Sequence, residues 1–207
     1  DLYMVNDMAE KQPNTRFEES GGGLYKIKGG IGHSDWSADG MQPHLADKML
    51  EYLDENKDSD KPFFLYMALT APHIPLFPSK EFKGKSKIGD YGDLVMMIDD
   101  IVGRVNRKLK EIGKYDNTIV MFAADNGCAG YINMDRINRK GHYPSYIYRG
   151  YKSHGWEGGH RIPFILSWGD RYGHVTDNSL VSLTDLYATF ADMLGYRMAD
   201  DEAEDSF

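Results

Sequence analysis

An acidic residue and an amide residue follow directly after one apolar run of this chain. The run at 118–124 reads Thr-Ile-Val-Met-Phe-Ala-Ala and leads into Asp125, Asn126 and Gly127. If the run is a strand of an open α/β sheet, the two polar side chains lie at the end where such sheets bind ligands. Paired carboxylate and amide oxygens suit a hard cation, Ca²⁺ or Mg²⁺. Asn-Gly is also a favoured hairpin turn, so a plain turn stays the alternative.

Hydrophobic patterning predicts the elements that would position these residues. Apolar residues recur at helical spacing and predict helices at about 44–56, 93–112 and 184–194. Continuous apolar runs predict buried strands at 63–69, 118–124 and 163–168. This alternating order predicts the α/β class, with a largely parallel mixed sheet sandwiched by helices.

Several residues mark where these elements end. Asp93 is a plausible N-cap of the second helix, and Gly113 stands at its C′ position, where glycine is favoured. Gly195 ends the third helix in the same way. Two prolines flank His73, which forbids a helix there and holds an extended turn. The loops after the strands, where ligands bind, therefore hold His73, the Asp-Asn pair and the segment around Lys152.

The folded part of the chain is predicted at 43–198. Residues 1–42 are polar and rich in glycine, which predicts an irregular lead-in with at most a short helix. Residues 199–207 are acidic and predict a frayed tail. A length of 207 residues suffices for one sizeable domain or for most of a larger one.

Composition and charge exclude several classes of protein. The hydrophobic share of 41% is that of a folded protein rather than a disordered one. A net charge of −8 without any basic stripe argues against a nucleic-acid binder. No apolar run approaches the roughly 20 residues that a membrane helix needs. Cys128 is the only cysteine, so no disulfide can form within the chain.

Three segments carry motifs that agree in order and separation. They read Lys-Pro-Phe-Phe-Leu-Tyr-Met-Ala-Leu-Thr-Ala-Pro-His-Ile-Pro at 61–75, Asp-Asn-Thr-Ile-Val-Met-Phe-Ala-Ala-Asp-Asn-Gly at 116–127, and Gly-Tyr-Lys-Ser-His-Gly-Trp-Glu-Gly-Gly-His-Arg-Ile-Pro at 150–163. Together they resemble the type I, formylglycine-dependent sulfatases of the alkaline-phosphatase-like superfamily. The helical segment 91–112 resembles the family helix that precedes the Asp-Asn-Gly strand. The resemblance covers about 42–195.

This resemblance implies a function and a set of site residues. It implies a sulfuric ester hydrolase that releases sulfate from a sulfated glycan or an aryl sulfate. Asp125 and Asn126 match two Ca²⁺ ligands of the family, with Mg²⁺ as the alternative metal. His73 matches a histidine that contacts the sulfate and helps with the leaving group, and Lys152 matches a lysine that binds a sulfate oxygen. Glu157 and Arg161 are interpreted as structural instead, either as an ion pair or through backbone bonds that set the turn.

The chain also departs from the family pattern. It lacks the Cys/Ser-x-Pro-x-Arg motif whose Cys or Ser becomes the formylglycine nucleophile, and Cys128 is followed by Ala-Gly-Tyr instead. It also lacks the strand with paired aspartates that supplies the other metal ligands. We therefore interpret the chain as an inactive interior fragment of a longer sulfatase, with formylglycine expected in the missing N-terminal part and a small domain missing after the acidic tail.

Three alternatives to this reading stay open. A phosphodiesterase or phosphotransferase of the same superfamily is one, although Asn is a poor ligand for the Zn²⁺ those enzymes use. A non-catalytic pseudo-sulfatase that only binds sulfate or glycan is the second, and an unrelated α/β domain is the third. The resemblance further implies a secreted, periplasmic or lysosomal location. Tyrosines and cations in 128–150 suit a sulfated saccharide, although ordinary packing of the tyrosines explains them equally well.

Overall fold

The computed structural model describes residues 3–5 and 8–206, and it divides the chain into two compact units. The first unit comprises residues 1–171 and the second comprises residues 172–207. Residues 1–2 and 6–7 of the predicted lead-in, and residue 207 of the predicted tail, lie outside the described residues. The boundaries predicted from the sequence after residues 42 and 198 stay a prediction.

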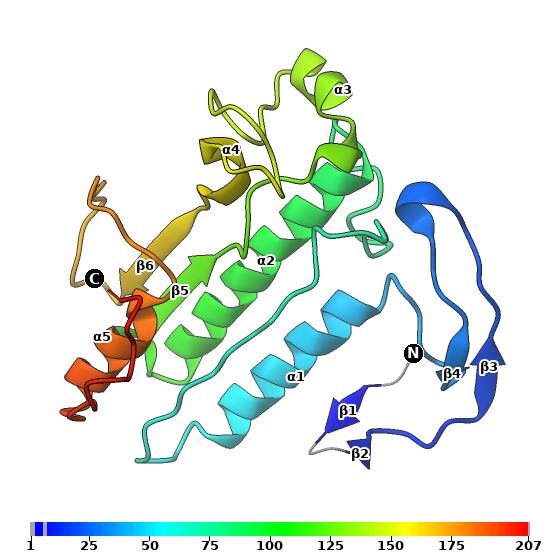
Figure 1. Cartoon of the computed structure of the whole chain (residues 1–207). Coiled ribbons are helices and arrows are strands. Elements are labelled where there is room, and N and C mark those ends of the chain that lie inside the picture. The colour runs from blue at the N-terminus through cyan, green and yellow to red at the C-terminus, as the bar shows by residue number, and fades with distance from the viewer. Residues whose placement is uncertain (1–2, 6–7, 207) are drawn as a thin grey trace. The chain divides into compact units, whose positions relative to one another are not determined.

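Two long helices carry the core of the first unit. They are α1 (Met41–Glu55) and α2 (Asp90–Glu111), which lie side by side in Figure 1 and confirm two of the predicted helices. Their apolar stripes form two clusters of buried side chains. One includes Ala46, Leu94, Met97 and Ile101, and the other is Leu53, Val105 and Leu109. An amphipathic helix is stabilised mainly by packing of this kind.

The ends of α2 follow the expected chemistry except at its N-cap. The N-cap is Gly89, so the prediction of Asp93 as N-cap is wrong. Asp93 lies one turn inside the helix, where its carboxylate accepts backbone N–H bonds from Gly84 (2.7 Å) and Ser86 (2.6 Å). It therefore ties down the loop that precedes the helix. Gly113 has φ +69°, which confirms the predicted C′ glycine.

Residues 63–69 are extended but form no strand, so the predicted buried strand is wrong. Alternate side chains are half-buried, and Phe63, Leu65, Met67 and Leu69 of this face pack against the helical core. On the other face, Phe64 is 73% and Tyr66 is 80% exposed. The period of two is that of a strand, but no described residue pairs with the segment along its edge.

The apolar run before the Asp-Asn pair does form a strand. It is β5 (Ile119–Ala123), and it pairs with β6 (Phe164–Trp168). The pairing is antiparallel, with Met121 opposite Leu166, so the two predicted strands exist and form an antiparallel pair, as a mixed sheet contains. Val120 of β5 packs on the helical core, which fixes the strand against α1 and α2.

The remaining elements of the first unit are short. The lead-in holds two small antiparallel ribbons, which are β1 (Met4–Val5) with β2 (Met8–Ala9), and β3 (Thr15–Phe17) with β4 (Gly30–Gly32). The excursion between β5 and β6 holds the short helices α3 (Met134–Arg139) and α4 (Glu157–His160). Every strand pair within the described residues is antiparallel.

The second unit contains one helix, α5 (Asp185–Met193), within its described residues. It confirms the third predicted helix, and Gly195 after it has φ +66°, as a C′ glycine should. The acidic tail folds back within this unit, because Glu202 accepts hydrogen bonds from Tyr187 (3.2 Å) and from the backbone N–H of Ala199 (2.7 Å). Across the described part of both units, no helix is long and apolar enough to cross a bilayer.

Candidate functional site

Asp125 and Asn126 lie directly after the end of β5, as the sequence predicted. Asp125 is exposed, and its carboxylate makes no hydrogen bond or ion pair with any described residue. Asn126 is half-buried, and its Nδ2 donates to the carbonyl of Gly127 (3.1 Å). That bond uses the nitrogen end of the amide and leaves Oδ1 without a partner among the described residues, so the two carboxylate oxygens and one amide oxygen are available at this strand end.

Backbone hydrogen bonds join this loop to the segment that holds Lys152. The N–H of Gly127 donates to the carbonyl of Gly159 (2.9 Å), and the N–H of Lys152 donates to the carbonyl of Cys128 (2.8 Å). A third bond closes the Lys152 segment on itself, from Gly158 to the carbonyl of Arg149 (2.9 Å). Residues 24 and 32 positions apart in the chain are therefore held in direct contact by main-chain groups.

Two glycines make this close approach possible. A Cβ at Gly127 would collide with the carbonyl of Gly158, and a Cβ at Gly158 would collide with the carbonyl of Gly150. A side chain at Gly127 would push the two loops apart, and a side chain at Gly158 would distort the Lys152 segment itself. The glycines of the Asp-Asn-Gly and Glu-Gly-Gly motifs are therefore explained by backbone packing, a role that the sequence reasoning missed.

His73 reaches the same region through an aromatic contact. Its ring lies edge-on to the ring of Tyr131, with centroids 5.9 Å apart, and Tyr131 follows Cys128 by three residues. The Nδ1 atom lies 2.7 Å from the carbonyl oxygen of Ile74. Because a carbonyl only accepts, Nδ1 carries the proton of this bond, and Nε2 is the nitrogen that remains for a ligand. The imidazole is exposed and free to meet one.

Lys152 has no internal partner for its charge among the described residues, whereas its neighbours Glu157 and Arg161 pair with each other. Lys152 is half-buried, and its ammonium group forms no hydrogen bond or ion pair within the described chain. Arg161 instead binds Glu157 (3.2 Å) and lies over the ring of Tyr148 at 4.6 Å. This confirms the interpretation of Glu157 and Arg161 as a structural ion pair.

The oxygens at Asp125 and Asn126 fit part of a hard-cation site. Ca²⁺ takes 6–8 oxygen ligands in proteins. Here one carboxylate and one amide oxygen are present without competing partners. No group of three or more His, Cys, Asp or Glu side chains gathers as a metal site anywhere in the described residues. The donor set is therefore chemically suitable but supplies only part of a full coordination shell.

Cys128 lies next to these residues but is a structural thiol. Its Sγ lies 3.5 Å from the hydroxyl of Tyr91, a residue of α2. Burial raises the pKa of the Cys128 thiol, and burial also raises the pKa of the Tyr91 phenol, with a further rise from Cys128. Both groups are therefore held in their neutral forms, and the thiol is a poor nucleophile.

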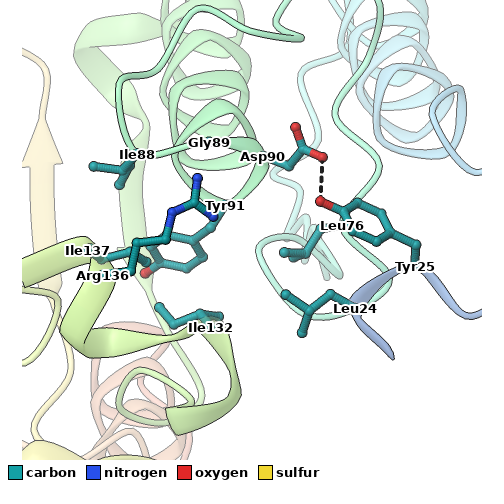
Figure 2. A pocket seen from close by; sticks show the side chains of 10 residues that line it. All are labelled: Leu24, Tyr25, Leu76, Ile88, Gly89, Asp90, Tyr91, Ile132, Arg136 and Ile137. Atoms are coloured by element: carbon teal, nitrogen blue, oxygen red, sulfur yellow. Dashed lines mark hydrogen bonds between the residues drawn. The ribbon is translucent and has the colours of Figure 1, made fainter. Parts of the chain in front are cut away.

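A small cavity lies beside this region. It has a volume of about 180 Å³ and is lined by residues of the lead-in, α2 and α3, among them Tyr25, Asp90, Tyr91, Ile132 and Arg136. Figure 2 shows Tyr25 bonded to Asp90 (2.8 Å) on one side and Arg136 with Ile132 on the other. None of the predicted site residues lines it, so it is not the pocket that the sequence predicted.

The tyrosine and cation cluster predicted within 128–150 is dispersed. Lys140 donates to the carbonyl of Lys87, and Arg136 faces the small cavity. Tyr148 is half-buried and packs edge-on against Tyr146, with ring centroids 5.9 Å apart. Local contacts therefore explain Lys140, Arg136 and Tyr148. Tyr131, Tyr143 and Tyr146 remain exposed, so these side chains do not decide between ordinary packing and a binding surface.

Comparison with known proteins gives a consistent result. The model of the sulfatase family matches residues 6–196. An N-acetylgalactosamine-6-O-sulfatase of Bacteroides thetaiotaomicron is 33% identical over 174 residues, and an arylsulfatase of Hemicentrotus pulcherrimus is 35% identical over 166 residues. These matches cover 83% and 80% of this chain, but 34% and 29% of the relatives.

Solved structures agree with the sequence matches. A structure from Bacteroides thetaiotaomicron, described with the metabolism of multiple glycosaminoglycans, superimposes with a TM-score of 0.78 at 32% identity and covers 87% of this chain. A sulfatase from Pseudoalteromonas, PsFucS1, gives 0.71 at 29% identity and covers 88% of this chain. The chain spans 38% and 35% of those two structures, about a third of a complete relative. By fold and by sequence, the chain belongs to the sulfatase family, with the α/β, alkaline-phosphatase-like fold of that family in incomplete form.

Proposed function

We propose that this chain supplies the sulfate-binding and leaving-group side of a sulfuric ester hydrolase. The observation that carries the proposal is the junction of three loops. Main-chain bonds join the Asp125 loop to the Lys152 segment, and the His73 ring contacts Tyr131 of the same region. The proposal therefore assigns the ligands of the cation, the group that binds the sulfate and the proton donor to one part of the molecule.

Lys152 is proposed to bind a sulfate oxygen. Sulfuryl transfer concentrates negative charge on the equatorial oxygens, and a fixed cation stabilises that charge best where water is partly excluded. Lys152 is half-buried and has no internal carboxylate partner among the described residues, which leaves its charge for a ligand. Its backbone bond to Cys128 holds the residue against the Asp-Asn loop.

His73 is proposed to contact the sulfate and to protonate the leaving oxygen. The Nδ1 bond to Ile74 fixes the ring orientation and leaves Nε2 toward solvent. When the ring is protonated, Nε2 carries a hydrogen that it can donate to a developing alkoxide. This step matters most for a sugar ester, because a sugar alkoxide is a poor leaving group.

Asp125 and Asn126 are proposed to hold Ca²⁺, with Mg²⁺ as the alternative. Their free oxygens support this assignment, and residues outside this chain would complete the shell. Bound there, the cation would supply Lewis-acid stabilisation of the sulfate charge. The chain contains no Cys/Ser-x-Pro-x-Arg motif, so we propose that the 207 residues alone are inactive.

The substrate is proposed to be a sulfated glycan rather than an aryl sulfate. The support is that one relative is named an N-acetylgalactosamine-6-O-sulfatase and that another structural relative, Ps i-CgsB, was solved with a carrageenan hexasaccharide.

We also retain the proposal of an extracytoplasmic location, which fractionation of the source cells would test. A Cys/Ser-x-Pro-x-Arg motif in the longer protein would separate an enzyme from a non-catalytic binder.

The test is the kinetics of His73→Ala and Lys152→Ala in the longer protein. Loss of the proton donor should lower kcat/KM on a sulfated sugar by about 10²–10⁴-fold. Loss of the sulfate-binding cation should lower it by about 10²–10³-fold. His160→Ala and Lys140→Ala are matched controls, because His160 faces Glu157 and Lys140 binds a backbone carbonyl. Near-normal turnover in both site variants, or a preference for phosphate esters, would overturn the proposal.

A further inference from the structure

A row of rings and cations continues from the His73 loop past Lys152. We call Tyr131, Tyr151, His154, Trp156 and Arg149 the aromatic strip. Tyr131 and Tyr151 are each 40% exposed and Trp156 is 50% exposed, and the other two side chains are also exposed. These large aromatic rings do not form part of the core, and they are exposed beside a candidate site. Their exposure therefore calls for an explanation.

Contacts run from one end of the strip to the other. The ring of Tyr151 packs on Gly130, the residue before Tyr131, where a Cβ would meet the ring at 2.6 Å. Tyr151 and His154 have ring centroids 4.1 Å apart. Gly150 then joins His154 to Trp156, because a Cβ there would lie 3.0 Å from the Cβ of Trp156 and 3.2 Å from that of His154. The strip therefore contains two observed side-chain contacts, Tyr151 with His154 and Arg149 with Trp156, and the backbone at Gly150 packs between the two pairs.

Arg149 is the last member of the strip. Its guanidinium group lies over the ring of Trp156, with Cζ 3.9 Å from the ring centroid. Stacking occupies one flat face of the guanidinium and leaves its N–H edge open. That edge is a fork that matches the two oxygens of a sulfate or carboxylate. Because the stack already restrains the side chain, less entropy is lost when an anion binds.

The charges of the strip are available to a ligand. Arg149 forms no ion pair within the described residues, whereas the nearby Arg161 is paired with Glu157. Lys152 directly follows Tyr151 in sequence, and the protein as a whole carries a net charge of −8. A local group of cations on an acidic protein attracts an anionic ligand to one place rather than to the whole surface.

We propose that the aromatic strip binds the sugar that neighbours the scissile sulfate, and that Arg149 binds a second anionic group on that sugar. The second group is a sulfate or a carboxylate. The apolar C–H face of a pyranose ring can pack on an exposed aromatic face, while the paired N–H groups of Arg149 bind the anionic group at the edge of the sugar. This inference rests on the proposed function, and it narrows the substrate from a sulfated glycan to one with at least two anionic groups.

The test measures binding by the protein itself, using calorimetric titration with four sugars. These are N-acetylgalactosamine 6-sulfate, the same sugar linked to neutral galactose, the same sugar linked to glucuronate, and a carrageenan disaccharide with a sulfate on each ring. We expect the two dianionic disaccharides to bind at least tenfold more tightly than the neutral disaccharide. Their comparison with each other distinguishes a carboxylate from a sulfate as the second group. Turnover does not enter, so a failure of the proposed function is seen separately in the kinetics of the longer protein.

Variants assign the effect to Arg149. We expect Arg149→Ala to remove most of the tenfold ratio, and Arg149→Lys to restore only part of it because the fork is lost. Arg171→Ala is the matched control, since Arg171 lies over the ring of Trp168 at 4.3 Å in the same stacked geometry. Equal binding of charged and neutral disaccharides, or an equal loss in Arg171→Ala, would overturn the inference. Circular dichroism of each variant verifies folding, and a misfolded Arg149→Ala leaves Arg149→Lys to decide.

Discussion

At the scale of single residues, Cys128 is the side chain whose chemistry the structure constrains most clearly. It follows Asn126 by two residues, yet it faces inward to the hydroxyl of Tyr91. Desolvation disfavours the thiolate, and this raises the thiol pKa above its ordinary value. A group with a raised pKa keeps its proton in the folded state, so the reactive form appears only at higher pH.

We predict that Cys128 is slow to react with iodoacetamide in the folded protein. At pH 8 the rate should be lower than that of the same thiol in the urea-unfolded chain, because burial raises the thiol pKa and so lowers the fraction of thiolate. The profile of rate against pH should also rise at a higher pH than in the unfolded chain. Labelling that proceeds equally fast in both states would contradict the buried environment.

The sequence identified the candidate residues better than it identified their supports. Motifs lead directly to His73, Asp125 and Lys152, whose roles stay predictions. The importance of Gly158 was missed, because its reason is a contact with Gly150 that exists only once the chain has folded back. Tyr131 was seen in the sequence only as one of several tyrosines in a loop, since nothing local reveals its contact with His73.

At the scale of elements, the loop before α2 depends on one buried carboxylate. Asp93 is fully buried, at 0% exposure, and it accepts two backbone hydrogen bonds from Gly84 and Ser86. It also lies in the first turn of α2, where the helix dipole favours a negative charge. Hydrogen bonds to a charged group are worth more than neutral ones, and their loss leaves buried donors unpaired.

We predict that Asp93→Ala lowers the free energy of unfolding by about 3 kcal/mol. Chemical denaturation followed by circular dichroism measures this change. Asp99→Ala is the matched control, because Asp99 lies exposed on the same helix and accepts no hydrogen bond from a described residue. It should change stability by less than about 0.5 kcal/mol. A similar effect of both substitutions would mean that Asp93 does not hold the loop.

The helices were predicted better than the sheet, and for a physical reason. Helical periodicity and glycine C′ signals are local, so α1, α2 and α5 lie within a few residues of their predicted bounds. Whether an apolar run becomes a strand depends on a partner elsewhere in the protein. Residues 63–69 have strand-like alternation but are not part of a strand in the structure. Neither the sequence of β5 nor that of β6 determines whether the two strands pair parallel or antiparallel.

At the scale of the whole molecule, the chain is about a third of the length of its curated relatives. Within the described residues, β5 pairs only with β6, which leaves its second edge open. The segment 63–69 presents Phe64 and Tyr66 to solvent and is extended without being part of a strand. Open edges and exposed aromatic rings of this kind are surfaces that further strands cover in larger sheets.

The central claim is that His73, Lys152 and the Asp-Asn pair face one cation and the anion beside it. Paramagnetic broadening by Mn²⁺ tests this most directly, since Mn²⁺ takes the same oxygen ligands as Ca²⁺ and broadens only nearby NMR signals. We predict that substoichiometric Mn²⁺ broadens the imidazole signals of His73 and the ε-methylene signals of Lys152 together, and that Asp125→Ala abolishes both effects. Sharp signals from either side chain at saturating Mn²⁺, or broadening that survives in Asp125→Ala, would contradict the account.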